Sequence, residues 1–318
     1  MMGKIKRRTT KGRILCQQLS PMINLLEKCS RVLPLRSLKQ KNQGPDPLFF
    51  CVVSPSLAPY RNLGSLMHDK KPAHLIYSIS KSPEKTPSNK KEVVRAFGAG
   101  FLCHYLLDRA AHPFVYAQQF ALCNAGIEGL DKRDGHEVHA VIESELDEMI
   151  LYTHTGHTVS SFKPYKEILQ ANEGTLAAIS HAVCSTFWET YQRLSPANLF
   201  EKSVHNYRKI QCATYSPHGF KRNLYGVVER RFRRHSFAQA FCHRPLALTE
   251  SAFDNHEHNV WVDPFTNECH TTSFEDIFTN TLEEANTVIP HFISGSLSLD
   301  ETIALCRNLN FSGKPACA

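Results

Sequence analysis

The stretch EVVRAFGAGFLCHYLLDRAAH, residues 92–112, decides how this chain folds because it is apolar on nearly every side. A helix of that composition is buried at the centre of a domain instead of lying on its surface. Pro113 follows directly and predicts the end of the helix, because proline lacks the N–H that continues the hydrogen-bond ladder. Inside the stretch, His104 and Asp108 stand four residues apart and share one helical face. Burying both without partners costs on the order of several kcal/mol, so they must be hydrogen bonded, ion-paired or bound to a metal.

A second helix repeats this arrangement. Residues 136–152, HEVHAVIESELDEMILY, are amphipathic, with His139 and Glu143 again four residues apart. Imidazole and carboxylate at this spacing form a pair of zinc ligands. Two such pairs on neighbouring helices predict a metal site between them, and a kink at Pro113 would bring His112 towards the same place.

The remaining pattern is helical as well. Further helices are expected at 172–194, 219–243 and 274–290, the last opened by Ser273 and Asp276 at capping-box spacing. Residues 42–60 are dense in proline and predict a loop, and strand patterns are scarce. We therefore expect an all-α fold, with residues 42–318 forming one multi-helical domain.

The net charge of +7 is unevenly placed along the 318 residues. Residues 1–41 contain eleven Lys or Arg and one acid, Glu27, so this basic arm carries +10 and the rest sums to about −3. Within the arm, residues 21–38 predict a short amphipathic helix. The arm is interpreted as a solvated leader, with contact to nucleic acid or to an anionic membrane surface as the alternatives.

Targeting signals and cysteine spacing bear on the compartment. The chain lacks an uninterrupted apolar run long enough to span a bilayer and a recognisable secretory signal, which predicts a soluble, cytoplasmic protein, peripheral to the membrane if the arm binds lipid. The eleven cysteines are odd in number and lack CxxC spacing, which favours free thiols.

Two other segments contain candidate binding residues. The run ERRFRRH, residues 229–235, places Arg230 and Arg234 on a predicted helix, where guanidinium groups suit phosphate. The loop DNHEHNVWVDP offers His256 and His258, which could line a substrate cleft. The alternatives are a solvated helix face and a loop that is simply anchored by Trp261.

Four ordered motifs together resemble a known family. NQGPDPLFF, NLGSLMH, GFLCHYLLDRAAHPFVY and HEVHAVIESELDEM look like the zinc-dependent phospholipase C family, particularly its unexported bacterial branch. That family is similar in metal chemistry to single-strand-specific zinc nucleases. The motifs cover roughly residues 40–150, and the later YSPHGFKR and HNVWVDP resemble the family more loosely.

The resemblance implies a helical fold around a cluster of zinc ions that hydrolyses phosphodiesters. It implies that the metal ligands are His68, His104, Asp108, His112, His139 and Glu143, with Asp46 as a further ligand or as the base that orients or deprotonates water. The family's third zinc uses the N-terminal residue and a nearby histidine, whereas the first histidine of this chain is His68. We therefore expect two zinc ions, and a third only if its site is completed differently.

The expected function is a zinc-dependent hydrolase of phosphodiester bonds, acting on phospholipids by C-type or D-type cleavage with a metal-activated water. Two alternatives stay open. One is a non-catalytic, metal-binding protein that docks on membranes through the basic arm. The other is a zinc nuclease.

Overall fold

The computed structural model describes residues 44–168 and 171–316, and within them the chain is almost entirely helical. The all-α prediction is confirmed, since the described strands are only two residues long each and form one antiparallel pair. In chain order the elements are η2 (Asp46–Val53), η3 (Pro55–Tyr60), α2 (Leu63–Asp69), α3 (Pro72–Lys81), η4 (Ser82–Lys85), η5 (Ser88–Lys90), α4 (Lys91–Asn124), η6 (Lys132–Asp134), α5 (Gly135–Thr155), α6 (Pro164–Glu167), α7 (Glu173–Tyr191), α8 (Leu199–Thr214), α9 (Phe220–Glu229), α10 (Phe237–Ala240), β1 (Trp261–Val262), β2 (Cys269–His270), α11 (Phe274–Ser294) and α12 (Leu299–Cys306).

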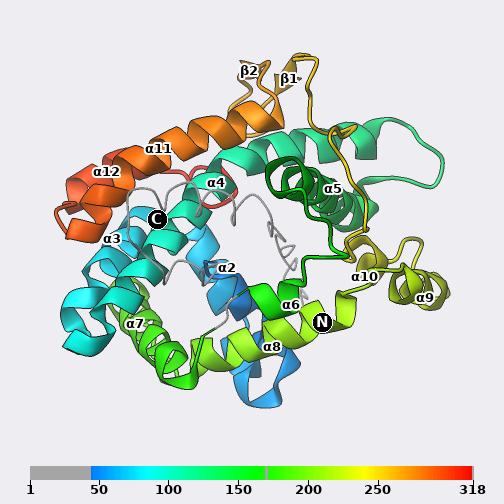
Figure 1. Ribbon diagram of the computed structural model, residues 1–318. Coiled ribbons are helices and arrows are strands. Elements are labelled where there is room, and N and C mark those ends of the chain that lie inside the picture. Colours follow the sequence, from blue (N-terminus) through cyan, green and yellow to red (C-terminus); the bar gives the residue numbers. More distant parts are fainter. Residues whose placement is uncertain (1–43, 169–170, 317–318) are drawn as a thin grey trace, which may run out of the picture.

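Helix α4 is the centre of the molecule, as its composition predicts. It packs against α3, α5, α7 and α11, and Figure 1 shows α11 lying alongside it and α5 next to its C-terminal half. The predicted end at Pro113 is wrong, because α4 continues through that residue to Asn124. A proline inside a helix costs about 3 kcal/mol or more. Burial of α4 among these helices offsets that cost, with Phe114 and Val115 both in the core directly after the proline.

Three of the other predicted helices are confirmed, and one is wrong. The helix expected at 136–152 is confirmed as α5, that at 172–194 as α7, and that at 274–290 as α11, with its capping box between Ser273 and Asp276. The helix expected at 219–243 is wrong: it is broken into α9 and the short α10, and residues 230–236 between them form turns and bends. Residues 46–60, expected as loop, form the 3-10 helices η2 and η3.

One hydrophobic core runs from Leu48 in η2 to Phe311 after α12. The cysteines at the eight described positions are free thiols, as their spacing predicts. Among the helices of the described ranges, none combines the length and apolar character required to cross a bilayer. The basic arm, residues 1–41, and its predicted helix lie outside the described residues.

Candidate metal centre

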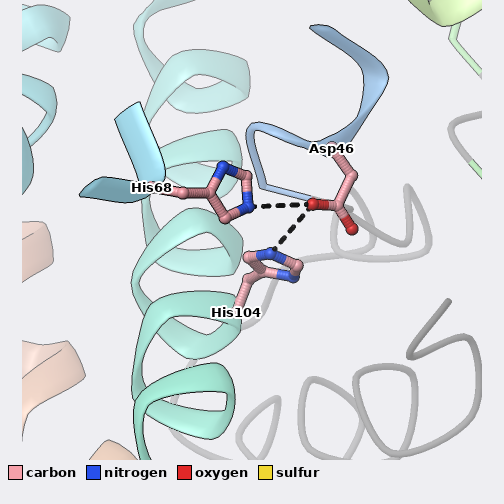
Figure 2. Close-up of side chains that lie close together, drawn as sticks. All are labelled: Asp46, His68 and His104. Carbon is pink, nitrogen blue, oxygen red and sulfur yellow. Dashed lines mark hydrogen bonds and ion pairs between the residues drawn. The ribbon is translucent and has the colours of Figure 1, made fainter. Parts of the chain in front are cut away.

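Three side chains from separate elements meet at the first residue of η2. Asp46 opens η2, His68 lies on α2 and His104 lies in the middle of α4. The Oδ1 of Asp46 is 3.2 Å from Nε2 of His68 and 3.5 Å from Nε2 of His104, as Figure 2 shows. We call these three residues group one. Their ligand atoms lie close enough together to hold one metal ion.

The loop before Asp46 lies directly on the imidazole of His104. Gly44 has a φ of +49°, and a Cβ at this residue would be 2.4 Å from Cδ2 of His104. Only glycine tolerates both this left-handed conformation and this close approach. Gly44 therefore allows the carboxylate two residues later to reach two histidines that are 36 positions apart, His68 and His104.

A second group forms between α4 and α5. The Oε1 of Glu143 is 3.4 Å from Nε2 of His112 and 3.1 Å from Nε2 of His139. The two imidazole rings are stacked with centroids 5.8 Å apart. We call these residues group two, and their ligand atoms also lie close enough together for one metal ion. His112 reaches the group from within α4, which continues through Pro113.

Asp108 lies between the two groups. Its Oδ2 is 3.3 Å from Nε2 of His104 in group one and 4.0 Å from Nδ1 of His112 in group two. His104, Asp108 and His112 follow one another at four-residue intervals along α4, so they form a single stripe on that helix. Together with the two groups, Asp108 completes a cluster of seven, which we call the seven-residue cluster. It contains every metal ligand expected from the sequence, and each member is at most 6% exposed.

Acceptors behind the imidazoles fix their orientation. The Nδ1 of His68 is 2.8 Å from the carbonyl of Gly64, and the Nδ1 of His112 is 2.7 Å from the carbonyl of Phe311. A carbonyl only accepts, so in both histidines Nδ1 donates and Nε2 points to the carboxylates. This arrangement is typical of metal-binding histidines, whose other nitrogen is held by an outer partner.

Gln119 has the same role behind His139. Its Oε1 is 2.8 Å from Nδ1 of His139 and so joins α4 to α5. Gly135, at the start of α5, makes room for it, because a Cβ there would be 2.7 Å from Nε2 of Gln119. Gln119 was not among the residues expected at the site from the sequence. Its position seven residues after His112, two turns along the same helix, was the available signal.

The segment after α12 closes the cluster from the other side. Phe311 is fully buried, with its ring 4.7 Å from that of His68 and 5.9 Å from that of His104. Its N–H donates to the carbonyl of His68. Gly313 has a φ of +69° and packs on Pro113, where a Cβ would be 2.4 Å from the proline ring. This segment was not expected at the site, because NFSGK, residues 310–314, has only the signature of a turn.

Several buried polar atoms of the cluster have no hydrogen-bond partner among the described residues. They are Oδ2 of Asp46, both ring nitrogens of His104 and Oε2 of Glu143. Buried polar atoms are nearly always satisfied, and those that are not indicate a strained, catalytic or ion-binding site. The donor set of imidazoles and carboxylates matches the ligands that zinc prefers. The residues therefore fit a bound metal at both groups.

The electrostatics of the cluster also favour bound cations. Burial alone would lower the pKa of His104, but the carboxylates of Asp108 and Asp46 raise it to about 10. Burial would also lower the pKa of His112, but Asp108 and Glu143 raise it to about 9. Burial would raise the pKa values of Asp46 and Glu143, but the neighbouring imidazoles lower both. The cluster thus holds ionised carboxylates in a buried place, where either protons or metal ions balance their charge.

The four residues expected at a substrate cleft lie apart from the cluster. His256 pairs with Asp254, at 2.9 Å from Nδ1 to Oδ1, and lines a surface hollow of about 700 Å³ beside Trp261. His258 lies 3.3 Å from Asp276. Arg234 pairs with Asp131 at 2.8 Å, and Arg230 contacts Gln239. Among the described interactions of these four residues, none reaches a member of the seven-residue cluster.

Comparisons with protein-family models, with curated proteins and with solved structures found no match to this chain. The candidate centre therefore stands on its own geometry.

Proposed function

We propose that the chain is a zinc-dependent hydrolase of phosphodiester bonds, with phospholipids as the favoured substrates. The observation that carries the proposal is the pair of buried His/carboxylate groups linked by Asp108 on consecutive turns of α4. The sequence resemblance to zinc-dependent phospholipases C adds the substrate class. Its motifs and the geometry select the same seven residues.

Group one would hold one zinc ion and group two another, with Asp108 contacting both sites. When bound, two neighbouring zinc ions supply Lewis-acid polarisation of a phosphoryl oxygen and lower the pKa of a water molecule. Three ligands of its own for each metal is the number that leaves a fourth position for water or substrate, and wherever Asp108 also bound, water would need a fifth position.

Asp46 is the residue that we assign to the attacking water. Its Oδ1 faces the two imidazoles of group one, whereas Oδ2 points away from both, as Figure 2 shows. Oδ2 has no hydrogen-bond partner in the described chain, and the lowered pKa keeps the carboxylate ionised. An ionised carboxylate with a free oxygen can orient a water molecule and accept its proton.

A closed structural metal centre is the second candidate, and one observation favours it. The seven-residue cluster is almost completely buried, whereas a catalytic zinc needs a coordination position open to water. Both candidates predict bound metal, so metal content alone does not distinguish them. Only the hydrolase predicts activity.

The test combines metal content with activity. Purified protein and the variants His104→Ala and Glu143→Ala are analysed for zinc and assayed on a phosphocholine chromogenic ester, on phosphatidylcholine vesicles and on single-stranded DNA, with and without chelator. We expect about two zinc ions per chain, chelator-sensitive hydrolysis of the lipid substrates, and loss of both in the variants. His181→Ala is the control, because His181 is exposed on α7.

Each other outcome has a defined meaning. Full metal content and full activity in both variants would falsify the proposal. Bound zinc without hydrolysis of any substrate would establish the structural centre, and activity on DNA alone would establish a nuclease.

A further inference from the structure

Helix α9 turns its apolar side chains towards the solvent. Phe220 is 74% exposed and Val227 61%, and Phe232, in the turn that follows, is 85% exposed. Leu224 and Val228 are exposed beside them. Residues 220, 224, 227 and 228 fall on one side of a helix. We call this side of α9, together with Phe232, the α9 face. Contiguous exposed apolar side chains of this kind mark an interaction surface.

The inward side of α9 is held by polar contacts and by the close packing of the Gln239 side chain on Gly226. The hydroxyl of Tyr225 donates to the carbonyl of Ala213 at 3.0 Å, and Glu229 accepts from the hydroxyl of Ser236 at 2.7 Å. Gly226 is buried, and a Cβ there would be 2.6 Å from Oε1 of Gln239 on α10. The helix is thus amphipathic with its apolar side outward, so its orientation is fixed by specific contacts. Figure 1 shows α9 at the rim of the molecule, against α10.

Basic side chains surround the α9 face. Arg230, Arg231, Arg233 and Arg234 follow the helix directly, and Lys221 lies near its start. Arg233 pairs with Glu137 at 3.6 Å and Arg234 with Asp131 at 2.8 Å. The side chain of Arg230 donates to the neutral amide of Gln239, and neither Arg230 nor Arg231 forms an ion pair within residues 44–168 and 171–316. The surface is therefore both apolar and positively charged.

The positive charge and the exposed apolar side chains together indicate which kind of partner could bind the α9 face. A second copy of the chain would bring the same basic residues face to face, and the basic arm carries +10 of its own, so both would be repelled. Nucleic acid would satisfy the arginines but leave valine and leucine side chains in water. An anionic lipid surface satisfies both, because headgroups bind arginine and the acyl boundary buries the apolar side chains.

We propose that the α9 face docks the protein on membranes that contain anionic phospholipid. The helix would lie in the plane of the interface, with Phe220, Val227 and Phe232 inserted and Arg230 and Arg231 at the headgroups. Docking uses none of the metal-binding residues, so this proposal can be tested independently of the proposed hydrolase activity.

The experiment is co-sedimentation of the full chain with vesicles of phosphatidylcholine and phosphatidylserine, or of phosphatidylcholine alone. Phe220→Ser combined with Phe232→Ser should weaken binding to the mixed vesicles by at least about tenfold, since apolar insertion is lost. Arg230→Gln combined with Arg231→Gln should weaken it by about thirtyfold and reduce its salt dependence. The unmodified chain should bind the neutral vesicles far more weakly.

Matched controls test whether the loss of vesicle binding is specific to the α9 face or follows from removing any exposed apolar or basic side chain. Leu194→Ser removes an apolar side chain that is 79% exposed elsewhere, and Lys202→Gln with Lys209→Gln removes two charges on α8. Neither should change binding. Glu143→Ala should bind vesicles like the unmodified chain, which distinguishes failure of the hydrolase from failure of docking.

Three results would overturn the proposal. In the first, vesicle binding survives both variant pairs, which assigns membrane contact to other basic residues such as those of the arm. In the second, the α9 variants lose binding to single-stranded DNA while vesicle binding is absent throughout. In the third, the substituted residues govern self-association in sedimentation velocity and leave vesicle binding unaffected.

Discussion

At the scale of single residues, the main feature of the candidate centre is that its ionisable side chains are buried. Asp46, Asp108 and Glu143 are ionisable groups at 3% exposure or less, in a region otherwise filled with aromatic and aliphatic side chains. A buried carboxylate is tolerated only when it is paired or bound to a metal. Four histidines supply the partners, and the imidazoles of His104 and His112 are the groups that exchange a proton for a metal ion.

This exchange predicts that metal uptake releases protons. In the metal-free protein the raised pKa values of His104, about 10, and His112, about 9, keep both imidazoles protonated near neutral pH. A metal ligand must be a neutral imidazole, so binding near pH 7 should release about two protons per chain. The release should decline as the pH rises through 9 to 10, and metal affinity should increase with pH below this interval and level off within it.

Calorimetric titration with zinc in two buffers of different ionisation enthalpy measures the proton release. The variant His104→Ala should release fewer protons than the unmodified chain. Heats that are independent of the buffer at neutral pH would mean that these imidazoles are already neutral before metal binds.

At the scale of elements, α4 determines the arrangement of the cluster. It contributes His104, Asp108 and His112 as a stripe, and it continues past Pro113 far enough to place Gln119 behind His139 of α5. Had the helix ended at Pro113, this contact between the two helices would be absent. The continuous helix thus supplies both metal ligands and the residue that orients a ligand on its neighbour.

We therefore expect Gln119→Leu to weaken zinc binding by about ten- to a hundredfold, because His139 loses the acceptor that fixes its ring. The folded structure should persist, since leucine is similar in size and the contact lies at the buried helix interface. Gln118→Leu is the matched control: its amide reaches the carbonyl of Phe253 instead, at 3.5 Å. Competition with a zinc-binding dye measures both affinities, and equal values for the two variants would contradict an orienting role for Gln119.

At the scale of the whole molecule, the two ends of the described chain meet at the cluster. Gly44 and Asp46 approach from the N-terminal side, and Phe311 and Gly313 from the C-terminal side. Phe311 packs on His68 and His104 and offers its carbonyl to His112. The centre is therefore complete only when the chain has folded from η2 to the segment after α12.

Replacing Phe311 with alanine should cost about 3 to 5 kcal/mol of stability and should also weaken metal binding, because the cavity lies beside two ligands. Phe187→Ala is the comparison, since Phe187 is fully buried in α7 and packs near Tyr191. It should lower the free energy of unfolding by a similar amount while leaving zinc affinity unchanged. Denaturant unfolding and zinc competition on both variants separate the two effects, and equal zinc affinities would show that Phe311 only fills space.

The amino-acid sequence was enough to predict the helical class, the central position of residues 92–112 and the two pairs at four-residue spacing. These are local properties, since composition and a period of 3.6 residues fix which side chains share a helical face. His68 and Asp46 were reached only through the family resemblance, because no spacing connects them to α4.

How these parts combine depends on tertiary packing. It carried α4 through Pro113, because burial on several sides outweighed the lost hydrogen bond, and it broke the helix expected at 219–243, leaving the apolar side of α9 exposed. It also brought Gln119 and Phe311 behind the histidines. Such contacts join residues far apart in the chain, and their free energy depends on packing that no local pattern records.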